Sequence, residues 1–218
     1  MCQLKSCLVL KDRVFCPDYN SHQSMLEELG IKDDYLHASK IFVRVELTPP
    51  DGIRSPMEPL DRWTLKVDQD IVPEWWDEKA DRQRVEEAVE IWRKGHVFAE
   101  GEHSISAGIV YALGRATVKA CGSTKVEAYG RAMVKAWDRA MVKACDNATV
   151  TAHDRAMVGA HNSVTVKAHG NAKVKAFDRA IVRACNSATV EAFDSAMVVY
   201  PEERKIIYPA GWTTKMHE

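Results

Sequence analysis

The chain has 218 residues, of which 46% are hydrophobic, and its 30 Lys and Arg residues nearly balance its 31 Asp and Glu residues. This length and composition predict one or two folded domains and exclude a chain that is disordered throughout. The formal net charge of −1 argues against a strongly basic nucleic-acid-binding protein, and no apolar run approaches the roughly 20 residues that cross a bilayer.

The six cysteines are scattered along the chain and do not form the dense framework of a small disulfide-bonded domain. The apolar stretch at residues 8–10 is too short for a secretory signal peptide. We therefore expect a reduced, cytoplasmic protein with no membrane partner.

Residues 1–107 contain no repeat and are predicted to form an acidic α+β head domain. Alternating and β-branched residues predict strands at 8–10, 13–15, 41–47 and 63–67. A short helix is expected from Ser21 to Leu29, because serine caps helix starts and Gly30 suits the end of a helix. A longer helix is expected from Pro73 to about Lys94, and residues 96–107 are expected to lead into the next domain.

Candidate chemistry in the head domain is sparse. Asp68 and Asp70 follow a predicted strand, and with His22 they are the residues expected to act if the head is an enzyme or a nucleotide-binding domain. The alternative is a helix-entry loop with solvated acidic side chains. A zinc site is a further alternative, although its ligands lack the paired C-x-x-C spacing; they would be Cys2, Cys7, Cys16 and His22. No phosphate-binding loop, catalytic-triad order or zinc-protease motif is present, so we predict no catalytic residue and no cofactor.

An octapeptide repeat occupies residues 108–200. Valine recurs at every eighth position, with a small residue usually two positions before it and alanine two positions after it until Tyr200. The valines are Val110, Val118, Val126, Val134, Val142, Val150, Val158, Val166, Val174, Val182, Val190 and Val198. Small apolar residues that alternate with polar residues are typical of a strand with one buried face.

A three-residue link separates successive strands, and its second position is always Gly, Asp or Asn. These positions are Gly114, Gly122, Gly130, Asp138, Asp146, Asp154, Asn162, Gly170, Asp178, Asn186 and Asp194. The three residue types tolerate positive φ, so a left-handed turn is predicted in every unit. A strand and a turn that repeat in this way predict a β-solenoid.

Two octapeptides are predicted to form each coil, which gives about 16 residues per coil and a two-sided solenoid. Three strands per coil would enclose a triangular interior that the small Ala and Val side chains could not fill, whereas two facing strands enclose a thin layer. The predicted fold class is an α+β head domain, residues 1–107, followed by an all-β solenoid, residues 108–200, and a C-terminal cap or tail, residues 201–218.

The first link position sorts into two columns when the repeat is arranged in coils of 16 residues. One column contains Leu113, Tyr129, Cys145, His161, Phe177 and Phe193, and the other contains Cys121, Trp137, His153, His169 and Cys185. Stacked side chains on successive coils predict a structural ladder. The alternative is a metal site formed by His153, His169 and Cys185, because imidazole and thiolate are zinc ligands.

The two parts of the chain differ in charge. Residues 1–107 contain 14 basic and 21 acidic residues, whereas residues 108–200 contain 13 basic and 7 acidic residues. One outward column of the repeat, which we call the basic column, contains Lys119, Lys135, Thr151, Lys167 and Arg183. It is expected to be either a solvated exterior that discourages sheet aggregation or a face that binds an acidic partner. Nucleic acid is a weaker candidate because no aromatic side chains are interleaved with the basic ones.

The N-terminal region also carries a series of short motifs. They are Cys2-x-Leu4-Lys5-Ser6-Cys7, Asp12-Arg13-Val14-Phe15, Pro17-Asp18, Ser21-His22, Leu26-Glu27-Glu28-Leu29-Gly30, Val67-Asp68-Gln69-Asp70 and Pro73-x-Trp75. In these motifs the chain resembles a family of uncharacterised proteins from bacteriophages, prophages and gut Firmicutes. Members join such a region to short β repeats, so the resemblance covers the whole chain. It implies a mobile-element setting and no established activity.

These features together predict a non-enzymatic protein-binding module, which in a phage setting would inhibit a bacterial defence protein or another host protein. The host partner would bind the basic column or the region of Trp75 and Trp76, two residues that are otherwise expected in the head core. One alternative is an enzyme or nucleotide-binding protein with its site in the head. Another alternative is a structural assembly protein. The chain could also form a homo-oligomer in which the acidic head of one copy meets the basic solenoid of another. The expected location is the cytoplasm of the host bacterial cell.

Overall fold

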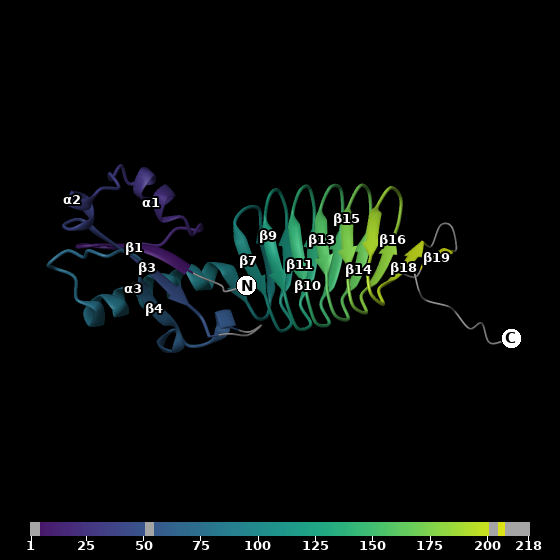
Figure 1. Ribbon diagram of the computed structural model, residues 1–218. Helices are drawn as coiled ribbons and strands as arrows, with labels where there is room; N and C mark the ends of the chain where they lie inside the picture. Colours follow the sequence, from purple (N-terminus) through teal and green to yellow (C-terminus); the bar gives the residue numbers. More distant parts are fainter. Residues whose placement is uncertain (1–4, 51–54, 201–204, 208–218) are drawn as a thin grey trace. The chain divides into compact units, whose positions relative to one another are not determined.

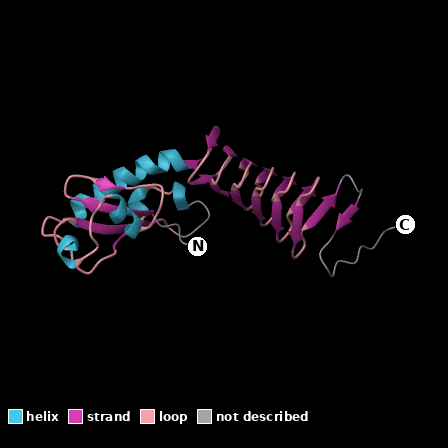
Figure 2. Cartoon of the chain, turned by 90° about the horizontal axis from the view of Figure 1, so that it is seen from above, coloured by secondary structure: helices cyan, strands magenta, loops and turns pink. Residues whose placement is uncertain are grey.

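A computed structural model of the protein describes residues 5–50, 55–200 and 205–207. The chain divides into two compact units, Met1–His96 and Val97–Glu218. Figure 2 shows helices in the first unit, whereas the second consists of strands joined by short loops. Of the expected C-terminal cap, the described part is strand β19 (Lys205–Ile207), which pairs with the last strand of the repeat; the rest of residues 201–218 lies outside the described residues.

The first unit is built on an antiparallel sheet with the strand order β2-β1-β3-β4 (Figure 1). These strands are β1 (Lys5–Leu10), β2 (Val14–Phe15), β3 (Phe42–Thr48) and β4 (Thr64–Val67). Helices are α1 (His22–Glu28), α2 (Tyr35–Ala38) and α3 (Glu78–His96), and Ser55–Met57 and Leu60–Arg62 form 3-10 turns. The predicted α+β architecture is thus present, whereas α2 and the 3-10 turns were not predicted.

Both faces of this sheet are covered, because alternate residues of a strand point in opposite directions. On one face, Cys7 and Val9 of β1 belong to a core that includes Val85 and Val89 of α3. On the other face, Leu8 and Leu10 belong to a core with Met25 and Leu26 of α1. The unit therefore has two small cores, with one helix packed on each side.

Helix α3 begins five residues later than predicted, at Glu78 rather than Pro73. The intervening residues form a turn in which the Trp76 amide donates to the Pro73 carbonyl (3.0 Å). The side chain of Asp77 accepts hydrogen bonds from the backbone amides of Lys79 and Ala80. An aspartate that satisfies these amides caps the helix more effectively than an N-terminal proline, which removes a donor but supplies no acceptor.

The second unit contains the predicted β-solenoid. Its first strands precede the valine repeat and are β5 (Val97–Phe98) and β6 (Glu102–Ile105). The strands of the repeat are β7 (Ile109–Ala112), β8 (Thr117–Ala120), β9 (Lys125–Ala128), β10 (Met133–Ala136), β11 (Met141–Ala144), β12 (Thr149–Ala152), β13 (Met157–Ala160), β14 (Thr165–Ala168), β15 (Lys173–Ala176), β16 (Ile181–Ala184), β17 (Thr189–Ala192) and β18 (Met197–Tyr200). Residues 96–107, expected to lead into the first coil, already contribute strands to its sheets.

The strand register confirms 16 residues per coil. Val134 of β10 lies beside Val118 of β8 and Val150 of β12, and these pairings are parallel. Odd-numbered strands from β5 to β17 form a seven-stranded sheet, and even-numbered strands from β6 to β18, with β19, form an eight-stranded sheet (Figure 1). Alanine and valine side chains from both sheets are buried in one continuous core, as the thin two-sided interior requires.

The links adopt the predicted left-handed turn, since φ is positive at all eleven Gly, Asp and Asn positions. The acidic and amide side chains at these positions also bond along the solenoid, which was not predicted. The amide of Asn162 donates to Oδ2 of Asp178 one coil later (2.8 Å). Equivalent bonds join Gly122 to Asp138, Gly130 to Asp146, Asp138 to Asp154, Asp146 to Asn162 and Asp178 to Asp194. These side chains form a ladder that satisfies one backbone donor in each of six turns.

Candidate functional site

The corner columns of the solenoid form stacked ladders. The His153 ring stacks on Trp137 (5.7 Å between centroids) and on His169 (5.1 Å). In the other column, Phe177 stacks on His161 (4.7 Å) and on Phe193 (4.9 Å). Parallel rings at the coil spacing contact each other through their faces, so their nitrogens do not converge on one point. Within the described ranges, His153, His169 and Cys185 do not form a group whose ligand atoms lie within 4.8 Å of one another.

The basic column lies on the outer face of the eight-stranded sheet. Strand register places Lys135 beside Lys119, and Lys167 beside Arg183. Lys119 forms an ion pair with Glu102 of β6, a strand outside the repeat, and this contact lowers the pKa of the Glu102 carboxyl. The basic column is thus a continuous row in space, and Glu102 neutralises the charge of its first residue, Lys119.

A groove of about 590 Å³ lies on the outer face of the opposite, seven-stranded sheet. Its lining includes Met141, Met157 and Phe177 together with lysines and glutamates from β9 to β17. Gly159 of β13 stands between Lys143 and Lys175 on the neighbouring strands. A Cβ atom at Gly159 would approach only Nε2 of His161, at 3.9 Å. The missing side chain therefore leaves a hollow in an otherwise filled row of side chains.

Trp75 and Trp76 lie in the first unit. Both are half-buried and pack against the core that contains Val85 and Val89. The Trp75 indole N–H donates to the Lys40 carbonyl (2.8 Å). Both side chains therefore pack against the edge of the core and remain partly exposed.

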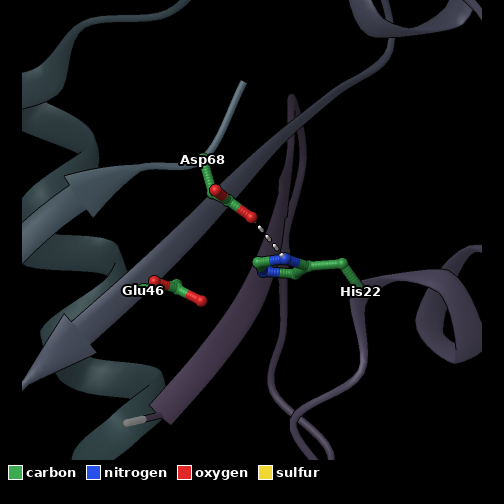
Figure 3. Close-up of side chains that lie close together, drawn as sticks. All are labelled: His22, Glu46 and Asp68. Carbon is green, nitrogen blue, oxygen red and sulfur yellow. Dashed lines mark ion pairs between the residues drawn. The ribbon is translucent and has the colours of Figure 1, made fainter.

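Three acid and base side chains converge in the first unit (Figure 3). His22 is the first residue of α1, where the Ser21 side chain accepts a hydrogen bond from the Ser24 amide (3.1 Å). Glu46 lies in the middle of β3. Asp68 directly follows β4, and its amide donates to the Arg44 carbonyl of β3 (2.9 Å). One ligand atom from each of the three lies within 4.8 Å of the others.

The structure thus brings together two of the three residues predicted for a head site, His22 and Asp68. Asp70 is not a member of this group; it lines a polar cleft of about 620 Å³ that also includes Asp68 and Lys66. Glu46 was not predicted as a site residue. The alternation of side chains along β3 gave one indication of its position. Val45 and Leu47 are buried on one face, so Glu46, which lies between them, must face the other side of the sheet.

The cysteines considered as zinc ligands lie apart from this group. Cys2 lies outside the described residues, and the group around His22 contains neither Cys7 nor Cys16. The register of β1 and β2 pairs Leu8 with Phe15, so that the adjoining residues Cys7 and Cys16 lie side by side, and both thiols are free. A hydrogen bond between them, with burial, raises the pKa of Cys7. The same bond and the nearby Lys5 ammonium lower the pKa of Cys16.

Lys5 is a buried charge beside these thiols. Its ammonium donates to the Tyr19 carbonyl (3.3 Å), to Oδ1 of Asn20 (3.2 Å) and to the Pro17 carbonyl. It also lies 5.0 Å from the centre of the Trp92 ring, a cation–π contact. Burial lowers the pKa of Lys5. These contacts supply the partners that a buried ammonium requires.

The observed folds define this protein as a β-solenoid with an α+β N-terminal unit. No family model matches the chain, and no match was found among curated proteins or among solved structures. Across the described ranges, no helix is both long and apolar enough to span a bilayer.

Proposed function

We propose that this protein is a non-enzymatic binding module whose solenoid captures a host protein through the groove of the seven-stranded sheet. The observation that carries the proposal is the hollow at Gly159, where an apolar floor meets a rim of lysines. The expected occupant is a segment of the partner that is acidic and carries apolar side chains.

The floor of the groove suits apolar side chains of a partner. Met157 is 44% exposed, although exposing an apolar side chain gives no benefit to an isolated solenoid. Methionine is flexible and polarisable, so it adapts to partner surfaces of varied shape. The Phe177 ring also lines the groove, and rigid aromatic rings are common anchors at protein interfaces.

The rim of the groove favours an acidic partner. Four lysines line it against two glutamates: Lys125, Lys143, Lys173 and Lys175 against Glu127 and Glu191. Glu191 forms an ion pair with Lys175 (3.3 Å), and Glu127 accepts a hydrogen bond from the Tyr129 hydroxyl (2.7 Å). The remaining positive charge around an apolar floor complements a negatively charged segment and would speed its association.

The basic column on the opposite sheet is the second candidate face and provides a matched comparison. Its side chains are also cationic, but every position in the row carries a side chain, so it has no equivalent of the hollow at Gly159. A flat cationic row would attract an acidic partner or a nucleic acid without selecting a shape. Shape and charge together therefore favour the groove.

Affinity capture from a bacterial lysate, followed by binding measurements with the purified partner, tests the proposal. Gly159→Trp fills the hollow, and the double variant K143E/K173E reverses two rim charges. We expect each to weaken binding at least about tenfold, the loss typical of a central interface contact. The matched control K135E/K167E, which changes the same charge on the other sheet, should bind as the unchanged protein does.

The opposite pattern would contradict the groove: loss of binding in K135E/K167E with normal binding by Gly159→Trp. Hydrogen exchange on the partner identifies the bound segment, and a basic protected segment would contradict the proposed chemistry. Gly159 does not have a positive φ, so tryptophan fits its backbone, and an unchanged circular dichroism spectrum confirms that the variant is folded.

A further inference from the structure

The first unit contains a site whose chemistry is separate from the proposed binding function. His22, Glu46 and Asp68 come from three different elements, α1, β3 and the residue after β4. His22 is 11% exposed at its side chain and Asp68 is 45% exposed, so the group is anchored inside and open to solvent at one end. Figure 3 shows the imidazole and the two carboxylates pointing toward a common point.

The hydrogen bond on the far side of His22 determines which ring nitrogen faces this point. Nε2 of His22 lies 3.2 Å from the Val45 carbonyl oxygen. A carbonyl only accepts hydrogen bonds, so Nε2 must carry the proton in this bond. In the neutral ring, Nδ1 then presents a lone pair to the carboxylates. This arrangement, in which histidine donates its second N–H to a backbone carbonyl, is the usual support for a metal-binding imidazole.

The separation between Nδ1 and the carboxylate leaves room for a cation between them. Nδ1 of His22 is 3.4 Å from Oδ2 of Asp68, which is longer than the roughly 2.7–3.2 Å of a hydrogen bond. Two ligands bound to zinc at about 2.0–2.1 Å in tetrahedral geometry lie about 3.4 Å apart. The observed separation is therefore one that two ligands of a single metal ion adopt.

We propose that His22, Glu46 and Asp68 bind a divalent transition-metal ion such as Zn²⁺. One imidazole and two carboxylates supply nitrogen and oxygen ligands, which zinc and related ions accept. Three protein ligands leave at least one coordination position for water or for an exogenous ligand. Asp68 also lines the polar cleft that contains Asp70 and Lys66, so an exogenous ligand would approach the ion from that side.

Co²⁺ is a suitable probe because it replaces Zn²⁺ in such sites and has a visible spectrum. Equilibrium dialysis of the full chain should show one bound Co²⁺, with the absorption of nitrogen and oxygen coordination and without a thiolate charge-transfer band. Asp68→Asn and Glu46→Gln keep the shape of each ligand and should weaken Co²⁺ binding more than about tenfold. Asp70→Asn is the matched control and should bind as the unchanged chain does.

Three results would overturn the proposal: no stoichiometric Co²⁺ binding, equal binding by Asp68→Asn and Asp70→Asn, or a thiolate band that assigns the ion to cysteine. In the first case the group is an imidazolium–carboxylate ion pair. Circular dichroism of each variant separates loss of a ligand from loss of the fold. Thermal unfolding gives an independent readout, since a metal that binds the native state raises the midpoint of the unchanged chain and of Asp70→Asn only.

Discussion

The ladder of turn residues predicts a graded response to substitution at Asp178. This residue has φ = 57°, and its Oδ2 accepts the Asn162 amide at 2.8 Å. Asp178→Asn retains an acceptor and tolerates positive φ, so it should change the free energy of unfolding by less than about 0.5 kcal/mol. Asp178→Gly retains the backbone conformation but loses the acceptor, at a cost of about 1 kcal/mol.

Asp178→Ala loses the hydrogen-bond acceptor and also strains the backbone. The methyl group supplies no acceptor, and alanine in the left-handed region costs about 1–2 kcal/mol more. The total of about 2–3 kcal/mol should lower the urea midpoint of the β-sheet circular dichroism signal in the order Asn, Gly, Ala. Ser195→Ala is a suitable control. Ser195 is exposed and follows Asp194 in the turn one coil later, but its own side chain is not part of the ladder. Equal midpoints for Asp178→Gly and Asp178→Ala would refute the strain argument, and an unchanged midpoint for Asp178→Gly would refute the hydrogen-bond argument.

Three further predictions concern the core, a tyrosine and the cysteine pair. Ala136 is fully buried between the sheets, so Ala136→Leu should destabilise the solenoid by about 1–3 kcal/mol, whereas Met133→Leu on the outer face should leave the urea midpoint unchanged. Burial, aided by the charge of Glu127, raises the pKa of Tyr111 to about 12. The native state therefore keeps the hydroxyl proton to a higher pH than the unfolded state does. The stability that this difference contributes is present below pH 10 and is lost as the pH rises to about 12. Tyrosinate absorbance should show this late titration, and Tyr111→Phe should reduce its amplitude by one tyrosine and remove the associated loss of stability. Finally, the lowered pKa of Cys16 predicts that alkylation modifies Cys16 before Cys7, as mass spectrometry can check; the reverse order would contradict the assignment of the thiolate.

The solenoid was predictable because its information is local and repeated. Each octapeptide specifies a strand by alternation and a turn by Gly, Asp or Asn, and twelve valines in one register leave a single solution. The bonds from turn side chains to the previous coil were harder to foresee, since they depend on the backbone geometry of a neighbour sixteen residues away. The hollow at Gly159 had a sequence indication, as glycine interrupts a column otherwise filled by larger residues.

The head site was only half predictable, because its parts are joined by tertiary structure. His22 and Asp68 were candidates on chemical grounds, but no local pattern distinguishes Asp68 from Asp70, two positions later. The pairing of β4 with β3 makes the distinction, by placing Val67 beside Val45 and so bringing Asp68 near Glu46. The predicted start of α3 was wrong for a related reason. Proline at residue 73 and aspartate at residue 77 both suit a helix start, and the observed hydrogen bonds favour the aspartate.

The coil length of sixteen residues restricts how this protein can evolve. A duplication or deletion of sixteen residues adds or removes one whole coil and returns every later strand to its own sheet. An eight-residue change preserves the repeat in the sequence but moves every later strand to the opposite sheet, so that residues of the groove and of the basic column exchange faces. Gene rearrangements in steps of sixteen therefore change the length of the solenoid while each later residue stays on its own face, and odd multiples of eight create new surfaces from the same octapeptides.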